Sequence, residues 1–137
     1  MRVLVADDEP LVREEIAEFL ELSGCEVRTA EDGRKALMVA ADWQPQVVFL
    51  DVLMPEMDGI DLTRALKSRD PKARIVAMSG GGRIKQLDIL EFAKRYGADY
   101  TITKPVTHQK LFEAISAIAG RAKGTTPAAA DDAKQPG

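Results

Sequence analysis

Short apolar runs rich in β-branched residues alternate along the chain with longer segments whose apolar residues recur at helical spacing. This alternation is typical of βαβ units, in which parallel strands are joined by helices that cover the sheet. The sequence therefore predicts an α/β fold with a doubly wound, five-stranded parallel sheet and helices on both faces. The strands are expected at residues 2–6, 25–30, 46–50, 74–78 and 99–103.

Apolar stripes and helix-breaking residues predict the helices between these strands. In the first, Pro10 suits the opening turn and Gly24 the position just past the end. The second should stop near Pro45, and the third before Pro71. The first helix has an apolar stripe, which consists of Leu11, Ile16, Phe19, Leu20 and Leu22. The second helix contains Ala36, Leu37, Val39 and Ala40, and the third is defined by Ile60, Leu62, Thr63 and Leu66. The last, at 107–119, is expected to face inward with Leu111, Phe112, Ile115 and Ile118.

The fourth helix has a less regular pattern than the others. At 100° per residue, one face carries Ile89, Phe92, Ala93 and Tyr96, and Ile84, Leu87 and Leu90 fall away from it. Either this helix starts late, with the earlier apolar residues packed from a loop, or an apolar strip is left for a partner. The loop interpretation is the simpler of the two.

The length of 137 residues suits one domain, and 45% apolar with 30% charged residues is ordinary for a globular protein. We expect a folded domain over residues 1–120. Residues 121–137 are expected to form a mobile tail rich in Ala and Pro, because it has no bulky apolar side chains to offset the entropy of ordering.

Several classes of protein are excluded by the composition. Cys25 and His108 are each the sole residue of their type, so neither an internal disulfide nor a zinc cluster is expected. No segment approaches the roughly 18 apolar residues of a membrane helix. A cytoplasmic protein without membrane contact is therefore predicted.

The net charge of -3 conceals an uneven distribution. The first sixty residues carry five basic and fourteen acidic residues, and the remainder carries fourteen basic and eight acidic ones. The basic residues are spread out and lack interleaved aromatic residues, so we expect no direct binding to nucleic acid.

Polar side chains follow four of the predicted strands. Asp7 and Asp8 follow the first, Asp51 the third and Ser79 the fourth, and Lys104 follows the fifth. In an open parallel sheet the ligand crevice lies outside the carboxyl ends of the strands. The five side chains should therefore converge on one edge of the sheet.

Three neighbouring carboxylates would repel one another strongly, so a cation is implied. Carboxylate oxygens without nearby Cys or His favour Mg²⁺, which commonly bridges to a phosphoryl oxygen. Asp51 could attack phosphorus to form an acyl phosphate, with the metal and Lys104 screening the transferring oxygens. Ser79 would donate a hydrogen bond to one of them.

Each residue also has an ordinary explanation when taken alone. Asp7 and Asp8 could belong to the start of a helix, where carboxylates are favoured. Asp51 and Ser79 could serve turns, and Lys104 could be a solvated surface lysine. Their joint occurrence at four strand ends favours a phosphate site.

Four stretches closely resemble the receiver domain of two-component response regulators. They are VADDEP at 5–10, FLDVLMPEMDG at 49–59, AMSG at 77–80 and TKP at 103–105. The resemblance spans about residues 1–120, with the motifs in the family's order. It implies the flavodoxin-like strand order 2-1-3-4-5.

The resemblance also implies a function and a set of site residues. Asp51 would accept a phosphoryl group from a phosphohistidine on a sensor histidine kinase or a histidine phosphotransfer protein. Mg²⁺ would be held by Asp8, Asp51 and the backbone carbonyl of Leu53, with Asp7 acting mostly through water. The bond between Lys104 and Pro105 would be cis and would aim the lysine at the site.

The sequence departs from the family pattern at the residue that normally changes rotamer to report phosphorylation. The family's usual aromatic residue, three positions before the lysine, is replaced by Thr101, and Tyr100 should point to the opposite face of the sheet. The conformational change that reports phosphorylation is expected to depend mainly on Ser79 and the loop that includes Gly80 and Gly81. Because glycine-rich backbone rearranges cheaply, this loop should reorder on phosphorylation.

Most relatives carry an output domain after the receiver, whereas this sequence ends. A single-domain regulator is therefore expected, which signals to an unknown downstream protein or passes the phosphoryl group along a relay, as a monomer or a phosphorylation-dependent dimer. The family's output face, made by the fourth helix, fifth strand and fifth helix, would be basic here. An acidic partner and ordinary solvated charges both explain its basic residues, Arg83, Lys85, Lys94 and Arg95.

Three other functions compete with this interpretation. A phosphatase of the haloacid-dehalogenase type requires an Asp two residues after the nucleophile, but Leu53 is at that position. Flavin binding requires a hydroxyl-rich phosphate loop after the first strand, which the sequence lacks. A binding-only pseudo-receiver is disfavoured by the intact acidic and basic residues.

Overall fold

A parallel sheet lies at the centre of the computed structural model, which describes residues 1–54, 56–80, 91 and 93–122. Its order is β2-β1-β3-β4-β5, so the predicted fold and strand order are confirmed. The predicted strand ends differ from the observed ones by a residue at most. The strands are β1 (Arg2–Ala6), β2 (Glu26–Ala30), β3 (Val47–Asp51), β4 (Arg74–Ser79) and β5 (Tyr100–Thr103).

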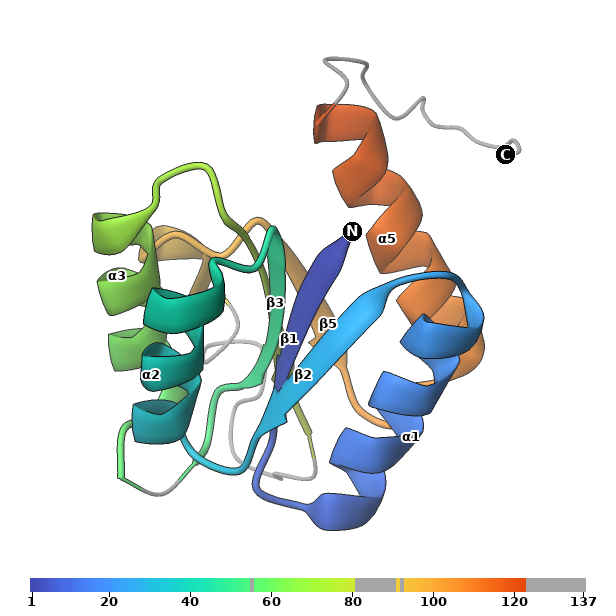
Figure 1. Cartoon of the computed structure of the whole chain (residues 1–137), viewed down its shortest axis with the longest axis horizontal. Coiled ribbons are helices and arrows are strands. Elements are labelled where there is room, and N and C mark those ends of the chain that lie inside the picture. Colours follow the sequence, from blue (N-terminus) through green and yellow to red (C-terminus); the bar gives the residue numbers. More distant parts are fainter. Residues whose placement is uncertain (55, 81–90, 92, 123–137) are drawn as a thin grey trace.

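Helices cover both faces of this sheet. In Figure 1, α1 (Pro10–Leu22) and α5 (His108–Ala122) lie on one side, and α2 (Gly33–Trp43) and α3 (Gly59–Arg69) on the other. Residues 93–95 are helical and belong to the predicted fourth helix. Its remaining predicted apolar positions at 84, 87, 89, 90 and 92 lie outside the described residues. No helix in the described ranges is long and apolar enough to cross a bilayer.

The core consists of two apolar layers, one on each side of the sheet. Alternate residues of a strand point to opposite faces, so Val3 packs on the α1 and α5 side while Leu4 packs toward α2 and α3. β3 is buried along its whole length, as expected for a central strand of a parallel sheet. This central position places the carboxyl end of β3 in the middle of one edge of the sheet.

Short polar side chains determine where two of the helices begin. Asp32 accepts a hydrogen bond from the backbone N–H of Lys35 at the start of α2. Asp58 accepts from the N–H groups of Ile60 and Asp61 at the start of α3. Both satisfy backbone donors that a helix cannot pair internally.

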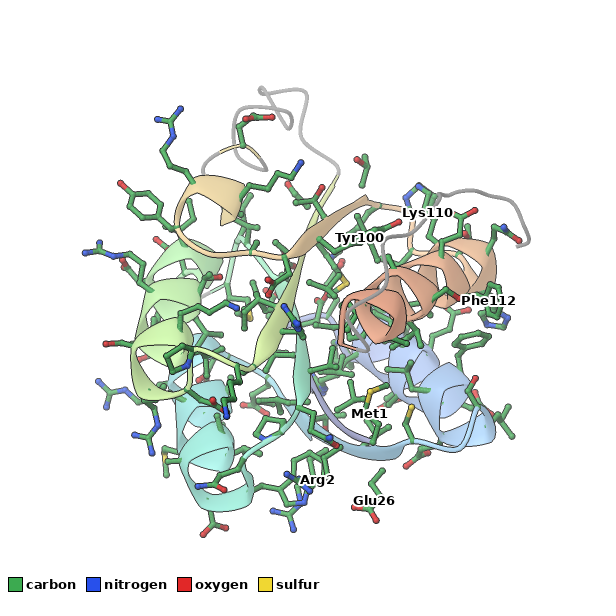
Figure 2. All side chains as sticks on the ribbon, turned by 90° about the horizontal axis from the view of Figure 1, so that it is seen from above. Met1, Arg2, Glu26, Tyr100, Lys110 and Phe112 are labelled. Carbon is green, nitrogen blue, oxygen red and sulfur yellow. The ribbon has the colours of Figure 1, made fainter. Side chains whose placement is uncertain are left out.

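Three residues predicted to face the core are instead exposed. Leu11 and Leu22 of α1 are each 82% exposed, since they lie on the side of the helix opposite Ile16 and Leu20. Phe112 is 63% exposed and points away from the sheet at the outer side of α5 (Figure 2). It follows the buried Leu111 by one residue, and therefore by 100° of rotation. The predictions for these three side chains were wrong.

Candidate functional site

The candidate site lies at the carboxyl ends of the strands, at the lower edge of the sheet in Figure 1. β1 pairs with β2 on one side and with β3 on the other, so the strand order reverses between β1 and β3. Ala6 is the register partner of Leu50. The residues that follow them, Asp7 and Asp51, therefore meet at the switch point where open α/β sheets bind ligands.

The ammonium group of Lys104 connects the carboxylates of this edge. Its Nζ lies 3.0 Å from Oδ2 of Asp7, 3.1 Å from Oδ2 of Asp51 and 3.5 Å from Oε1 of Glu9. Asp7 and Asp51 are buried, and the Lys104 side chain is only 15% exposed. Charged hydrogen bonds between buried groups, such as those from Lys104 to Asp7 and Asp51, are stronger than neutral ones.

Backbone groups hold each of these side chains in place. Oδ1 of Asp7 accepts a hydrogen bond from the N–H of Glu9, and Oδ1 of Asp51 accepts one from the N–H of Leu53. The N–H of Lys104 donates to the carbonyl of Ser79, which connects the ends of β4 and β5. The peptide bond between Lys104 and Pro105 is cis, as the family resemblance implied.

The pKa values of two of these groups respond to burial and to charge. Burial raises the pKa of Asp51, and the charge of Asp7 adds to the rise, against the opposing effect of Lys104. Burial acts to lower the pKa of Lys104, but the hydrogen bond to Asp7 and the charges of Asp51 and Asp7 outweigh it and raise that pKa. Lys104 is therefore a cation at neutral pH, and the Asp51 carboxylate would be stabilised by further positive charge.

The three acidic residues fit a divalent cation. Asp7, Asp8 and Asp51 can each bring one carboxylate oxygen within 4.8 Å of the others. These oxygens suit Mg²⁺, and the exposed Asp8 leaves room for the water molecules that Mg²⁺ retains. Asp7 is fully buried, whereas Asp8 is exposed, which agrees with an indirect role for Asp7.

Most of the predicted site residues line one open pocket above these carboxylates. The pocket is lined by Asp8, Glu9, Asp51, Leu53, Gly80, Lys104 and Pro105. Asp7 lies beneath it, and Ser79 is buried at the end of β4. Gly81 and most of the loop expected to reorder are outside the described residues.

The residue at the predicted switch position has the orientation expected from strand parity. Thr101 is the register partner of Ala77, which belongs to the layer beneath α2 and α3. Tyr100 packs instead against the layer beneath α1 and α5. Tyr100 is therefore on the wrong face of β5 to replace the missing aromatic side chain at position 101.

Glu9 is a residue of this pocket for which the sequence suggested no role. It stands beside Asp8, yet a glutamate at a helix start is ordinarily explained by the helix dipole. Only the direction of its side chain, toward Lys104, distinguishes it from that case. The available signal was the unbroken acidic run from Asp7 to Glu9.

Gly80 should be intolerant of any side chain, because a Cβ there would overlap the first carbons of the Lys104 side chain. Those carbons cannot move without the backbone that follows β5. We expect Gly80→Ala to lower the free energy of unfolding by about 1–3 kcal/mol and to displace Lys104 from Asp51. Urea unfolding, together with the rate of phosphoryl uptake from acetyl phosphate, measures both effects.

Gly24 provides the control for this substitution. It has a φ of +95°, and nothing lies within 4 Å of a Cβ built there. Gly24→Ala should therefore reduce stability through backbone strain without changing the rate of phosphoryl uptake. Equal rates in Gly80→Ala and the parent protein would contradict the predicted displacement of Lys104.

Comparison with known proteins agrees with this geometry. The sequence model of the response regulator receiver domain matches residues 3–116. The chain belongs to this family. The receiver domain is a signalling module of two-component systems, and the predicted family is thereby confirmed.

The curated relatives of this receiver domain are longer response regulators. Response regulator MprA of Mycolicibacterium vanbaalenii is 34% identical over 131 residues, which cover 93% of this chain and 52% of that protein. The probable transcriptional regulatory protein TcrX of Mycobacterium tuberculosis is 32% identical, with 90% and 52% covered. The chain thus spans about half the length of the curated relatives it matches.

Solved receiver domains have the same architecture. A response regulator receiver domain protein from Clostridium thermocellum superposes with a TM-score of 0.81 and 32% identity, covering 89% of this chain and 96% of that chain. NtrX from Brucella abortus gives a TM-score of 0.82 at 31% identity, covering 89% of this chain and 27% of that one. The receiver fold is therefore common to isolated domains and to longer chains.

Proposed function

We propose that Asp51 is the phosphoacceptor of this receiver domain, and that it takes a phosphoryl group from a phosphohistidine on a sensor histidine kinase or a histidine phosphotransfer protein. The observation that carries this proposal is the position of Lys104 Nζ, 3.0 Å from Asp7 and 3.1 Å from Asp51. A cation held there faces any phosphoryl group on Asp51.

The transfer is a displacement at phosphorus in which the protein positions the groups. A carboxylate oxygen of Asp51 forms a bond to phosphorus while the bond from phosphorus to the donor's imidazole nitrogen breaks, and the imidazole leaves with the electron pair. Lys104 stabilises the negative charge spread over the phosphoryl oxygens. Ser79, at the end of β4, is proposed to donate a hydrogen bond to one of these oxygens.

The second half of the cycle is hydrolysis. Attack of water on phosphorus releases inorganic phosphate and restores the Asp51 carboxylate. The protein therefore catalyses its own phosphorylation and dephosphorylation, and we propose no other substrate.

We further propose that Mg²⁺ is required, held by Asp8, Asp51 and the backbone carbonyl of Leu53. The bound ion would neutralise the carboxylates and orient a phosphoryl oxygen. Asp8 lies at the exposed rim, where water would complete the coordination, and Leu53 lines the same pocket as Asp51. Asp7 orients Lys104 and would act on the metal through water.

Intact mass spectrometry with Mg²⁺ and acetyl phosphate tests the proposal. A transient gain of one phosphoryl group supports the receiver function. Sustained turnover of small phosphate esters would instead indicate a phosphatase of the haloacid-dehalogenase type. No gain with any donor, including a phosphorylated histidine protein, would indicate a binding-only pseudo-receiver.

The output of the domain is proposed to be a change in protein–protein interaction or a phosphorelay step. Lys94 and Arg95 are exposed and positively charged, and an acidic partner surface would suit them. Single-domain organisation, the absence of direct nucleic-acid contact, a cytoplasmic location, the mobile tail at residues 121–137 and the choice between monomer and phosphorylation-dependent dimer all stay predictions.

A further inference from the structure

The side chain of Glu9 does not cap its own helix, α1. Glu9 is the N-cap residue of α1, but its side chain makes no capping hydrogen bond. Its backbone is anchored on both sides, because its N–H donates to Asp7 Oδ1 and its carbonyl accepts from the N–H of Arg13. The carboxylate lies instead at the pocket, 3.5 Å from Lys104 Nζ.

Three carboxylates surround the ammonium group of Lys104. Its Nζ donates hydrogen bonds to Asp7 and Asp51 and forms a longer ion pair with Glu9. A phosphoryl oxygen that reaches Lys104 must therefore compete with these carboxylates for the ammonium group.

Glu9 is the partner that can leave at the lowest cost. Asp7 and Asp51 are buried, and their other carboxylate oxygens accept hydrogen bonds from backbone N–H groups, so these side chains cannot swing away. The Glu9 side chain is 64% exposed and forms the longest of the three ion pairs. Exposed ion pairs contribute little, and the freed carboxylate would be solvated by water.

We propose that Glu9 is a positioning residue that holds the Lys104 ammonium group through an ion pair at the mouth of the pocket and releases it when Asp51 takes a phosphoryl group. The inference rests on the proposed phosphoacceptor function of Asp51. Glu9 thereby slows phosphoryl uptake, because its contact with Lys104 must break before the lysine can bind the phosphoryl oxygens.

Glu9→Gln tests this role because it keeps the length of the side chain and removes its charge. With acetyl phosphate at saturating Mg²⁺ and low salt, the variant should gain its phosphoryl group about two- to fivefold faster than the parent protein. High salt should remove most of the difference, since screening weakens exposed charge pairs. Intact mass at successive times measures both rates.

Two further variants separate the ion pair from simpler explanations. Glu18→Gln removes the same charge from an exposed position of α1 and should leave the rate unchanged. Glu9→Asp keeps the charge but ends one carbon short of Lys104, so it should be as fast as Glu9→Gln. Thermal unfolding of each variant checks that α1 remains intact.

Three results would overturn the role of Glu9: a Glu9→Gln rate no higher than that of the parent, a gain that high salt leaves unchanged, or a Glu9→Asp rate equal to the parent's. Any of these, in a parent protein that is phosphorylated on Asp51, leaves the phosphoacceptor proposal standing. A parent protein that no donor phosphorylates would reject both.

Discussion

Asp51→Asn is expected to abolish phosphoryl uptake from acetyl phosphate and from a phosphorylated histidine protein. The amide has no anionic oxygen to attack phosphorus, while its size and shape are nearly those of the carboxylate. Intact mass should show no added phosphoryl group at any time, in contrast to the parent protein. A gain equal to that of the parent would place the acceptor on another residue.

Asp58→Asn is the matched control for this substitution. Asp58 is exposed and caps α3 through the N–H groups of Ile60 and Asp61, a role that asparagine also performs. Its variant should be phosphorylated as fast as the parent. Loss of uptake in both variants would mean that the region from β3 to α3 responds to any substitution.

The same Asp51→Asn variant should unfold at higher urea concentration than the parent protein. Burial and the charge of Asp7 raise the pKa of Asp51, so its ionised form is disfavoured in the folded state relative to the unfolded one. The contribution destabilises the protein at pH values where Asp51 is ionised in the folded state, and it fades as the pH falls and Asp51 becomes protonated. The gain from Asp51→Asn should therefore shrink at low pH.

Lys104→Met is expected to lower the free energy of unfolding by about 3 kcal/mol in buffer without divalent ions. Methionine preserves the length and the packing of the side chain, but two buried carboxylates lose the cation that lies between them. The variant should also lose most of its phosphoryl uptake. Urea unfolding and intact mass measure the two effects.

A second substitution should reverse part of this loss of stability. Asp51→Asn in the Lys104→Met background removes one of the two carboxylates left without a cation, so the double variant should be more stable than Lys104→Met. Added Mg²⁺ should also stabilise Lys104→Met, because an ion that binds only the folded state raises its stability.

Lys35→Met provides the matched control for a lost lysine charge. Lys35 pairs with Glu31 on the exposed surface at the start of α2, so its removal should change stability very little. If Lys104→Met were as stable as this control, the buried ion-pair cluster would not hold the strand ends together.

The strands could be predicted closely because burial imposes a simple pattern on them. β3 is buried at all five positions, and a short run of apolar residues is typical of a central strand in a parallel sheet. The parity of Thr101 and Tyr100 followed from the alternation of side chains along a strand. These properties depend on local sequence, which is why they did not require the structure.

The buried face of each helix was harder to predict, because it depends on how the helix packs against the sheet. Leu11, Leu22 and Phe112 belong to plausible apolar stripes, yet each points to solvent. In α5 the buried residues include Ala114, which is too small to be noticed when only bulky apolar residues are considered.

The residues of the candidate site could be predicted from the sequence, but the directions of their side chains and the distances between them could not. The carboxyl ends of parallel strands share one edge, so Asp7, Asp51 and Lys104 could be placed on the same edge once the strands were assigned. The part played by Glu9 depends on the direction of one exposed side chain, which spacing does not determine. The distances to Lys104 required the folded chain.

A crystal structure with Mg²⁺ and beryllofluoride is the most direct test of the central claim. The account predicts beryllium bound to a carboxylate oxygen of Asp51, Lys104 Nζ in contact with a fluoride, and Mg²⁺ ligated by Asp8, Asp51 and the carbonyl of Leu53. A soaked crystal in which the pocket holds neither group, with Lys104 still joining Asp7 to Asp51, would contradict it.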